Sequence, residues 1–263
     1  MALNGINLPL AFVGQEWLWQ EVFFEYGLSF EDMGPFFSGP AFLPWFRMGN
    51  MRGWAGAGMN AAGMKEWIAV RGALQKRLLA RMRSFGMSAV LSAFAGHVPK
   101  ALIDKHPEAA SSRSRHWGHM RNQYGSVYML APEDPLFREI GNKFIAKQAE
   151  EWGTDHIYQT DTYNEMPPTN SSPAFLQSSA RAVLAGMDDA DPDSVWLMQA
   201  WLFHESFWQP PQMKAYLNAV PDDKMWLLDL NAEARPVWSL SESFYGKPFI
   251  WCTLLVYGGQ QGM

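Results

Sequence analysis

The chain has 263 residues, which suits one large α/β-barrel domain or two smaller domains, and its 48% hydrophobic and 18% charged residues are typical of a globular protein. A net charge of −5 argues against a nucleic-acid partner, and no apolar run approaches the roughly 18 residues of a membrane span. The single cysteine, Cys252, excludes an internal disulfide and a cysteine-based zinc cluster.

Met1-Ala-Leu-Asn-Gly-Ile reads as the end of a helix closed by Gly5, with a strand following at once. It has neither the basic start nor the apolar core of a signal peptide. A buried-type strand also stands close to the last residue. We therefore expect residues 1–263 to be a single barrel domain that is truncated at both ends.

Six short apolar runs have strand character, and helical patterns lie between them. The predicted strands are residues 6–13, 88–94, 156–163, 195–202, 225–231 and 248–255. The predicted helices are residues 15–26, 65–85, 135–152, 173–188 and 210–219. This alternation predicts βα units with a parallel sheet, and so an α/β fold: an incomplete (β/α)₈ TIM barrel with about six of its eight units. A doubly wound sheet is the alternative, although no G-x-G-x-x-G or P-loop motif supports nucleotide binding.

The helix predicted at 65–85 has an apolar stripe at three- and four-residue steps and a glycine just after it. The stripe consists of Trp67, Val70, Leu74, Leu78 and Met82. Phe85-Gly86 is expected to close this helix, and Trp152-Gly153 the helix at 135–152. The loop at 33–63, rich in Gly, Met, Trp and Pro, is long for a βα connection and is expected to lie over the site.

In a barrel the functional residues stand at the carboxyl ends of the strands. The most informative such end is Asn164-Glu165, which follows the Tyr- and Thr-rich run at 156–163 and precedes two prolines. A carboxylic acid at a strand end, beside an amide that can orient a sugar hydroxyl, suits acid-catalysed glycoside cleavage. Glu165 is therefore a candidate general acid, with a helix cap or an ion pair as the structural alternative.

Glycoside cleavage usually takes a second carboxylate. Asp229 and Glu233 are the candidates within the chain, but a barrel-interior hydrogen bond for Asp229 and a helix cap for Glu233 explain them more simply. Asp161 would share one face of a strand with Tyr163 and Glu165, where it either orients a partner or binds the loop.

Thirteen tryptophans are several times the usual number, and flat indole rings stack well on sugars. Trp54, Trp117 and Trp201 are candidates for sugar contacts, with core packing as the alternative for each. His97, His116 and His119 do not have the spacing of a helix-borne metal motif, so we expect no metal and no cofactor.

Segments along nearly the whole chain resemble glycoside hydrolase family 89, the α-N-acetylglucosaminidases of the lysosomal heparan-sulfate type. Those that carry the resemblance most clearly are Met1-Ala-Leu-Asn-Gly-Ile-Asn-Leu, Arg47-Met-Gly-Asn, Ala93-Phe-Ala-Gly-His-Val-Pro, Trp117-Gly-His, Leu130-Ala-Pro-Glu-Asp-Pro, Gly153-Thr-Asp-His-Ile-Tyr, Asp161-Thr-Tyr-Asn-Glu-Met, Trp196-Leu-Met-Gln-Ala-Trp-Leu-Phe and Pro248-Phe-Ile-Trp-Cys.

The resemblance implies a retaining exo-glycosidase that removes terminal α-linked N-acetylglucosamine from glycans such as heparan sulfate. It places the acid/base on Glu165 and substrate contacts on Asn164, Trp54, Trp117 and Trp201. It also implies an N-terminal α/β domain and a C-terminal helical domain outside this chain, through which an oligomer could form.

The resemblance places the nucleophile in an Ala-Pro-Glu-Gly segment that the 263 residues do not contain. We therefore expect little activity from the chain alone. A non-catalytic, carbohydrate-binding barrel remnant is the alternative, and Asp229 or Glu233 as a substitute nucleophile is a third reading. Gln260 stands where the family pattern has Asn, which puts that position's polar contact in question.

The resemblance further implies a lysosomal or secreted location for the complete protein. The sequon at Asn170-Ser-Ser fits that location, although such triplets are common.

Overall fold

The computed structural model describes residues 2–54, 61–253, 256–257 and 260–261. Its centre is a five-stranded parallel sheet in which each strand pairs with the next one along the chain. The strands are β1 (Val90–Ser92), β5 (Ile157–Gln159), β6 (Val195–Gln199), β7 (Met225–Asp229) and β8 (Phe249–Trp251). This sequential order is that of a TIM barrel, so the α/β prediction is confirmed and the doubly wound alternative is wrong.

The first predicted strand, at 6–13, lies beside β1 but forms a single parallel bridge, between Leu10 and Val90. Backbone hydrogen bonds from Val90 to Pro9 and from Ala11 to Val90 continue the pairing on either side. Because Pro9 has no backbone N–H to donate, this segment cannot form a continuous series of hydrogen bonds to β1. With this segment included, six of the predicted strands stand side by side. At the far end, residues 254–255 of the strand predicted at 248–255 lie outside the described residues.

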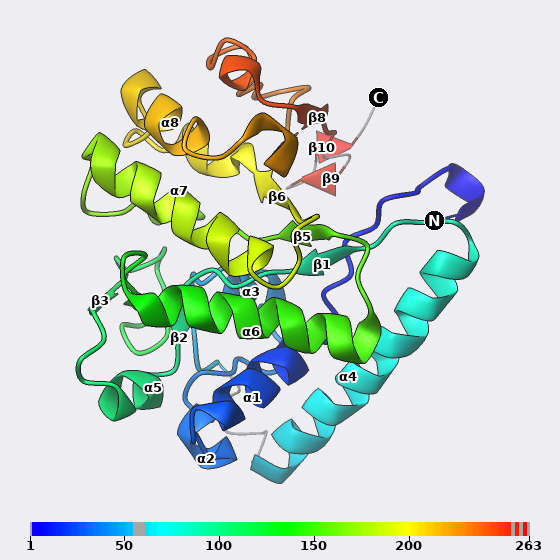
Figure 1. Ribbon diagram of the computed structural model, residues 1–263, viewed down its shortest axis with the longest axis vertical. Helices are drawn as coiled ribbons and strands as arrows, with labels where there is room; N and C mark the ends of the chain where they lie inside the picture. Colours follow the sequence, from blue (N-terminus) through cyan, green and yellow to red (C-terminus); the bar gives the residue numbers. More distant parts are fainter. Residues whose placement is uncertain (1, 55–60, 254–255, 258–259, 262–263) are drawn as a thin grey trace.

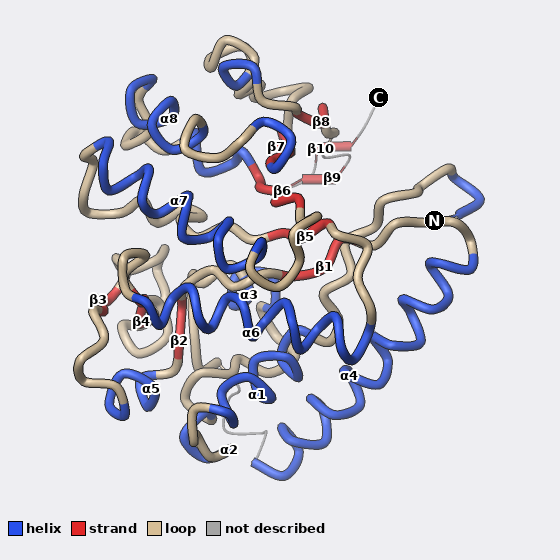
Figure 2. Tube along the Cα trace, viewed as in Figure 1, coloured by secondary structure: helices blue, strands red, loops and turns tan. Residues whose placement is uncertain are grey.

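Five helices match the predicted ones: α1 (Gln15–Glu25), α4 (Ala61–Ser84), α6 (Pro135–Trp152), α7 (Pro173–Asp188) and α8 (Pro210–Leu217). The helices α6, α7 and α8 lie side by side over one face of the sheet, and α1 packs against both α4 and α6 (Figures 1 and 2). The predicted glycine ends are confirmed, because Gly86 and Gly153 have φ angles of 70° and 71°, where a side chain would be strained.

The apolar stripe predicted for α4 is displaced from its buried face. Val70 is 60% exposed, whereas Met64, Ile68 and Leu79 are buried. Gly72 and Gln75 complete the buried line: Gly72 lies against the Trp17 ring, and the Gln75 amide donates to the Ala11 carbonyl at 2.6 Å. The stripe was misplaced because neither Gly nor Gln counts as apolar in a periodicity, although both lie at the packed interface.

A small antiparallel sheet between β1 and α6 was not predicted. It has the strand order β2-β4-β3 and consists of β2 (His97–Val98), β3 (Ser111–Arg113) and β4 (Tyr128–Leu130), with α5 (Lys100–Lys105) between the first two in sequence. Strands of two or three residues give no readable alternation. We call residues 96–134, which contain this sheet, the insert.

The remaining elements are short. They are η1 (Ala2–Asn4), α2 (Phe30–Met33), α3 (Leu43–Arg47), η2 (Ala200–His204), η3 (Asp222–Lys224), η4 (Phe244–Gly246), β9 (Val256–Tyr257) and β10 (Gln260–Gln261). No helix in the described part of the chain combines the length and the apolar character needed to cross a membrane.

Candidate active site

The segment that carries Glu165 is a turn rather than the end of a strand. β5 stops at Gln159, residues 162–165 form the turn, and Glu165 has a φ of 53°, in the left-handed region. The prediction that Asp161, Tyr163 and Glu165 share one face is therefore wrong, because side chains alternate only along an extended strand. The Tyr163 hydroxyl instead bonds the Ser179 hydroxyl of α7 at 2.7 Å, on the helix side of the sheet.

Two indole groups hold the carboxyl of Glu165. Trp117 Nε1 donates to Oε2 at 2.8 Å, and Trp201 Nε1 donates to Oε1 at 2.9 Å. Trp117 belongs to the insert and Trp201 to η2, which follows β6. Because an indole nitrogen can only donate, both carboxyl oxygens act as acceptors and the carboxyl plane is fixed. Glu165 remains partly exposed, so its carboxyl stays accessible.

Asn164 is buried and holds the turn together with Asn50. Asn50 Nδ2 donates to the Asn164 carbonyl at 2.7 Å, and Asn164 Nδ2 donates to Asn50 Oδ1 at 3.1 Å. Part of the Asn164 amide is thus committed to the protein, and a sugar contact would use its remaining polar positions. Sequence reasoning gave Asn50 no role. The only signal was its place in the Arg47-Met-Gly-Asn segment that carries the resemblance.

Trp54 lies at the outer end of a line of aromatic rings that leads to Trp117. Its ring is 5.3 Å from Phe42, Phe42 is 6.2 Å from Trp45, and Trp45 is 5.8 Å from Trp117, measured between ring centroids. Phe42 and Trp45 are partly exposed, at 42% and 37%. The structure thus brings Trp117 and Trp201 onto Glu165 and places Trp54 further out. Trp45 was missed, although it belongs to the loop at 33–63 that was expected to cover the site.

Asp161 lines a cavity of about 250 Å³ at the carboxyl ends of β5 and β6. It accepts the backbone N–H of Gln199 at 2.8 Å and a hydrogen bond from the Gln159 side chain. Burial raises the pKa of Asp161 to about 7, against the lowering effect of these hydrogen bonds. Asp161 therefore ties β5 to β6.

Arg47 closes the same cavity from the α3 side. Its guanidinium makes two 2.8 Å bonds to Glu16, a carboxylate that follows the first predicted strand. Because both Glu16 oxygens are bound to this guanidinium, Glu16 is engaged structurally.

The two candidates for a second carboxylate have structural partners. Asp229 is fully buried, and its Oδ2 accepts the backbone N–H groups of Val237 and Trp238 at 3.0 and 2.9 Å. Glu233 lies 3.1 Å from the side-chain amide of Asn231, within the turn after β7. These contacts favour a structural role for both residues, but the helix cap expected for Glu233 is wrong, because residues 230–234 form a turn and no helix begins there.

His97 is a core residue. It is fully buried among the rings of Trp19, Phe36 and Phe46, and burial lowers its pKa to about 3. His116 and His119 lie on the exposed part of the insert.

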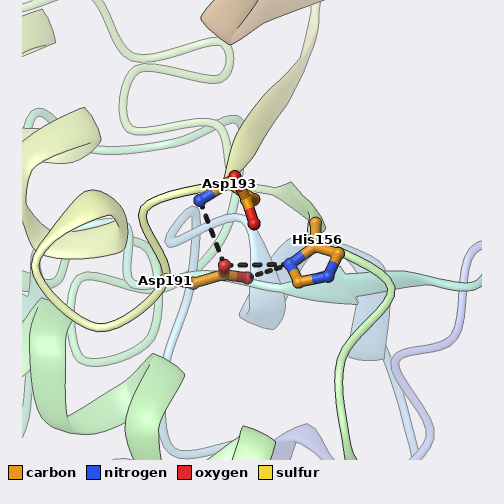
Figure 3. Close-up of side chains that lie close together, drawn as sticks. All are labelled: His156, Asp191 and Asp193. Carbon is orange, nitrogen blue, oxygen red and sulfur yellow. Dashed lines mark hydrogen bonds and ion pairs between the residues drawn. The ribbon is translucent and has the colours of Figure 1, made fainter.

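Among the described residues, His156, Asp191 and Asp193 are the group whose spacing could suit a metal (Figure 3). The Asp191 carboxylate already pairs with the His156 ring at 2.9 Å and accepts the Tyr158 hydroxyl at 2.6 Å. The group stands before β5 and β6, at the end of the sheet opposite Glu165, where barrel residues usually serve stability. We interpret it as a hydrogen-bonded tie between the two strands. The remaining expected contact, Gln260, has its side chain outside the described residues.

The family model of the α-N-acetylglucosaminidase TIM-barrel domain matches residues 1–263. The human α-N-acetylglucosaminidase is 46% identical over 265 residues, covering all of this chain and 35% of the human protein.

Among solved structures, a family 89 glycoside hydrolase from Clostridium perfringens in complex with 2-acetamido-1,2-dideoxynojirmycin has a TM-score of 0.82 and 30% identity, over 97% of this chain and 28% of its own. A form of the Clostridium perfringens enzyme with two Glu-to-Gln substitutions, in complex with its substrate GlcNAc-alpha-1,4-galactose, gives a TM-score of 0.81 at 29% identity. The chain thus spans 35% or less of the length of these relatives.

Proposed function

The chain belongs to the α-N-acetylglucosaminidase family, and we propose that it supplies the acid/base half of the active site of a retaining exo-glycosidase. The observation that carries this proposal is the carboxyl of Glu165, fixed by the indoles of Trp117 and Trp201 at the carboxyl end of the sheet. A general acid must meet the glycosidic oxygen in a defined direction, and two donors on one carboxyl supply that orientation.

In this mechanism Glu165 protonates the oxygen of the leaving sugar while a second carboxylate attacks the anomeric carbon. Glu165 then removes a proton from the water that hydrolyses the glycosyl-enzyme. A retaining enzyme holds its two carboxyls about 5–5.5 Å apart. Asp229 and Glu233 are engaged elsewhere, so we propose that the nucleophile is the Glu of the Ala-Pro-Glu-Gly segment implied by the family and absent from these 263 residues.

The substrate would be a glycan with a terminal α-linked N-acetylglucosamine, such as heparan sulfate, and the complete protein would act in the lysosome or outside the cell. The name of the human relative and the sugar ligands of the bacterial structures support this substrate class. Trp54, Trp117 and Trp201 would supply stacking surfaces, and Asn164 a polar contact to a hydroxyl. The chain alone would then show little or no turnover.

The test is a chimera in which this chain replaces the matching segment of the human enzyme, assayed with 4-nitrophenyl α-N-acetylglucosaminide. Glu165→Gln should lower kcat by about 10²–10⁴-fold, the usual contribution of general acid–base catalysis. Glu133→Gln, on an exposed residue of the insert, is the matched control and should leave kcat unchanged. A Glu165→Gln chimera with wild-type turnover would refute the proposal.

The second candidate, a carbohydrate-binding remnant without catalysis, is favoured only by the aromatic line from Trp54 to Trp117. It predicts N-acetylglucosamine binding by the isolated chain that Trp117→Ala weakens and Glu165→Gln leaves intact. Calorimetric titration of both variants separates the two functions, since only the first requires the Glu165 carboxyl.

A further inference from the structure

Trp201, one of the two donors to Glu165, stands on a short element. It belongs to η2, a 3-10 helix of five residues that follows β6, and its side chain is only partly buried. The direction in which its Nε1–H meets Glu165 therefore depends on what holds the indole ring. A residue that holds this ring would orient the proposed acid/base without touching the substrate.

Arg235, from the turn after β7, lies over the Trp201 ring. Its guanidinium carbon is 5.4 Å from the centre of the indole, within the range of a cation–π contact. A cation on the ring face resists rotation of the indole and makes its N–H a stronger donor. None of the ion pairs among the described residues involves Arg235, so its charge is not committed to a carboxylate there.

The backbone that carries Arg235 is held at several points. The Asn231 carbonyl accepts the Arg235 N–H at 2.7 Å. The buried Asp229 carboxylate accepts the Val237 N–H at 3.0 Å, and the Asp229 carbonyl accepts the Cys252 N–H at 3.1 Å, just after β8. Arg235 therefore projects from a fixed turn at the carboxyl end of the sheet.

His204 also contacts the Trp201 ring, with the ring centroids 5.0 Å apart and the ring planes inclined at 76°. Burial lowers the pKa of His204 and the charge of Arg235 lowers it further, whereas Asp229 raises it. The neutral form of His204 is thus favoured, and this residue contributes ring packing. The positive charge at the indole is that of Arg235.

Trp117, the second donor to Glu165, is supported by other contacts. Its backbone N–H donates to the Gly125 carbonyl at 2.6 Å, and its ring lies 5.8 Å from that of Trp45. These contacts come from the insert and from α3, not from the turn after β7. An effect of Arg235 on Glu165 should therefore pass through Trp201 and reach Oε1 only.

We propose that Arg235 is a positioning residue for the acid/base, because its guanidinium holds the Trp201 indole with the Nε1–H directed at Oε1 of Glu165. The catalytic consequence rests on the proposed function. The contact between Arg235 and Trp201 does not, and it can be measured without turnover.

The kinetic test is a double-mutant cycle in the chimera described above, with the same substrate. Arg235→Gln, at an exposed residue, should lower kcat about two- to fivefold, the size of a cation–π contact at an exposed site, and leave KM unchanged. Arg235→Lys keeps the cation and should keep most of the turnover. Arg235→Gln should have no further effect in a Trp201→Phe chimera, which has lost the N–H, but its full effect in a Trp117→Phe chimera.

The contact itself is measured in the 263-residue chain by nuclear magnetic resonance. The indole N–H signal of Trp201 is the one that disappears in Trp201→Phe. Its exchange with water should be about two- to fivefold faster in Arg235→Gln than in the wild-type chain, and nearly unchanged in Arg235→Lys. Arg181→Gln, at an exposed arginine of α7, is the matched control and should behave like the wild type in both measurements.

An unchanged exchange rate in Arg235→Gln would overturn the inference. So would a loss of kcat that persists undiminished in the Trp201→Phe chimera, or one that Arg235→Lys shares in full. Failure of the proposed function shows differently: the Glu165→Gln chimera would then keep its turnover, while the exchange rates would still report whether Arg235 holds the Trp201 indole.

Discussion

Asn50 and Asn164 exchange two hydrogen bonds although 114 residues separate them in sequence. One residue follows α3, and the other precedes Glu165 in the turn after β5. This pair holds the backbone from which Glu165 projects with its φ of 53°. The position of the proposed acid/base therefore depends on the loop over the site, because Asn50 of that loop is hydrogen-bonded to the turn that carries Glu165.

Replacing Asn50 by Ala should destabilise the chain and misplace Glu165. The buried Asn164 amide and carbonyl would each lose a partner, at a cost of about 1–3 kcal/mol in the free energy of unfolding. Urea denaturation measures this loss, and the chimera should also lose activity. Asn122→Ala, on an exposed part of the insert, is the control and should change stability little. An Asn50→Ala chain as stable as the control would show that the pair contributes no net stability.

Removing one indole N–H at the site should lower kcat more than it affects KM. Trp117→Phe and Trp201→Phe keep an aromatic ring but leave one oxygen of Glu165 without its donor. We expect about a tenfold fall in kcat for each, the size of one hydrogen bond that orients a catalytic group. Trp45→Phe is the control, since its ring lies 5.8 Å from that of Trp117, whereas the hydrogen bonds to the Glu165 carboxyl come from Trp117 and Trp201. Steady-state kinetics of the chimeras test this prediction. Equal kcat values in the Trp117→Phe, Trp201→Phe and Trp45→Phe chimeras would show that the two indole N–H groups do not orient Glu165.

Asp161 should make the chain less stable as the pH rises from about 4 to about 7. Burial raises its pKa to about 7 from an ordinary 3.8. Between these values the folded chain holds a proton that the unfolded chain releases, so the free energy of unfolding falls with pH by at most about 1.4 kcal/mol per unit. Asp161→Asn should remove this slope in urea titrations across that range. If the variant keeps the wild-type slope, another group is responsible.

His97 should make the chain less stable as the pH falls, which is the opposite of the pH dependence expected from Asp161. Burial lowers its pKa to about 3 from 6.5, so between these values the unfolded chain binds a proton that the folded chain does not. The stability of the fold is then lost as the pH falls from about 6.5 toward 3. His97→Phe should flatten this dependence, whatever its packing cost at neutral pH. Comparing the free energies of unfolding at pH 7 and pH 5 tests this prediction, with His106→Phe, at a partly exposed residue just after α5, as the control.

Much of the framework could be predicted from the sequence. Glycine or proline stands at one or both ends of α4, α6, α7 and α8. The continuous apolar runs at 88–94, 156–163, 195–202 and 225–231 predict buried strands. These signals lie within a few residues of the element that they define. The displaced stripe of α4 shows the limit, because Gly72 and Gln75 are buried only through contacts with Trp17 and Ala11, more than 50 residues away.

The sequence by itself determined the βα order, the family and the candidate Asn164-Glu165. Only the tertiary structure decided how that candidate is arranged. The insert brings Trp117 to Glu165, the segment after β6 brings Trp201, and α3 brings Asn50 beneath the turn. Each of these contacts joins residues far apart in the chain, and its geometry depends on how packed elements close on one another. A local pattern can identify a carboxyl at the end of a strand, but the direction in which that carboxyl is held depends on those distant residues.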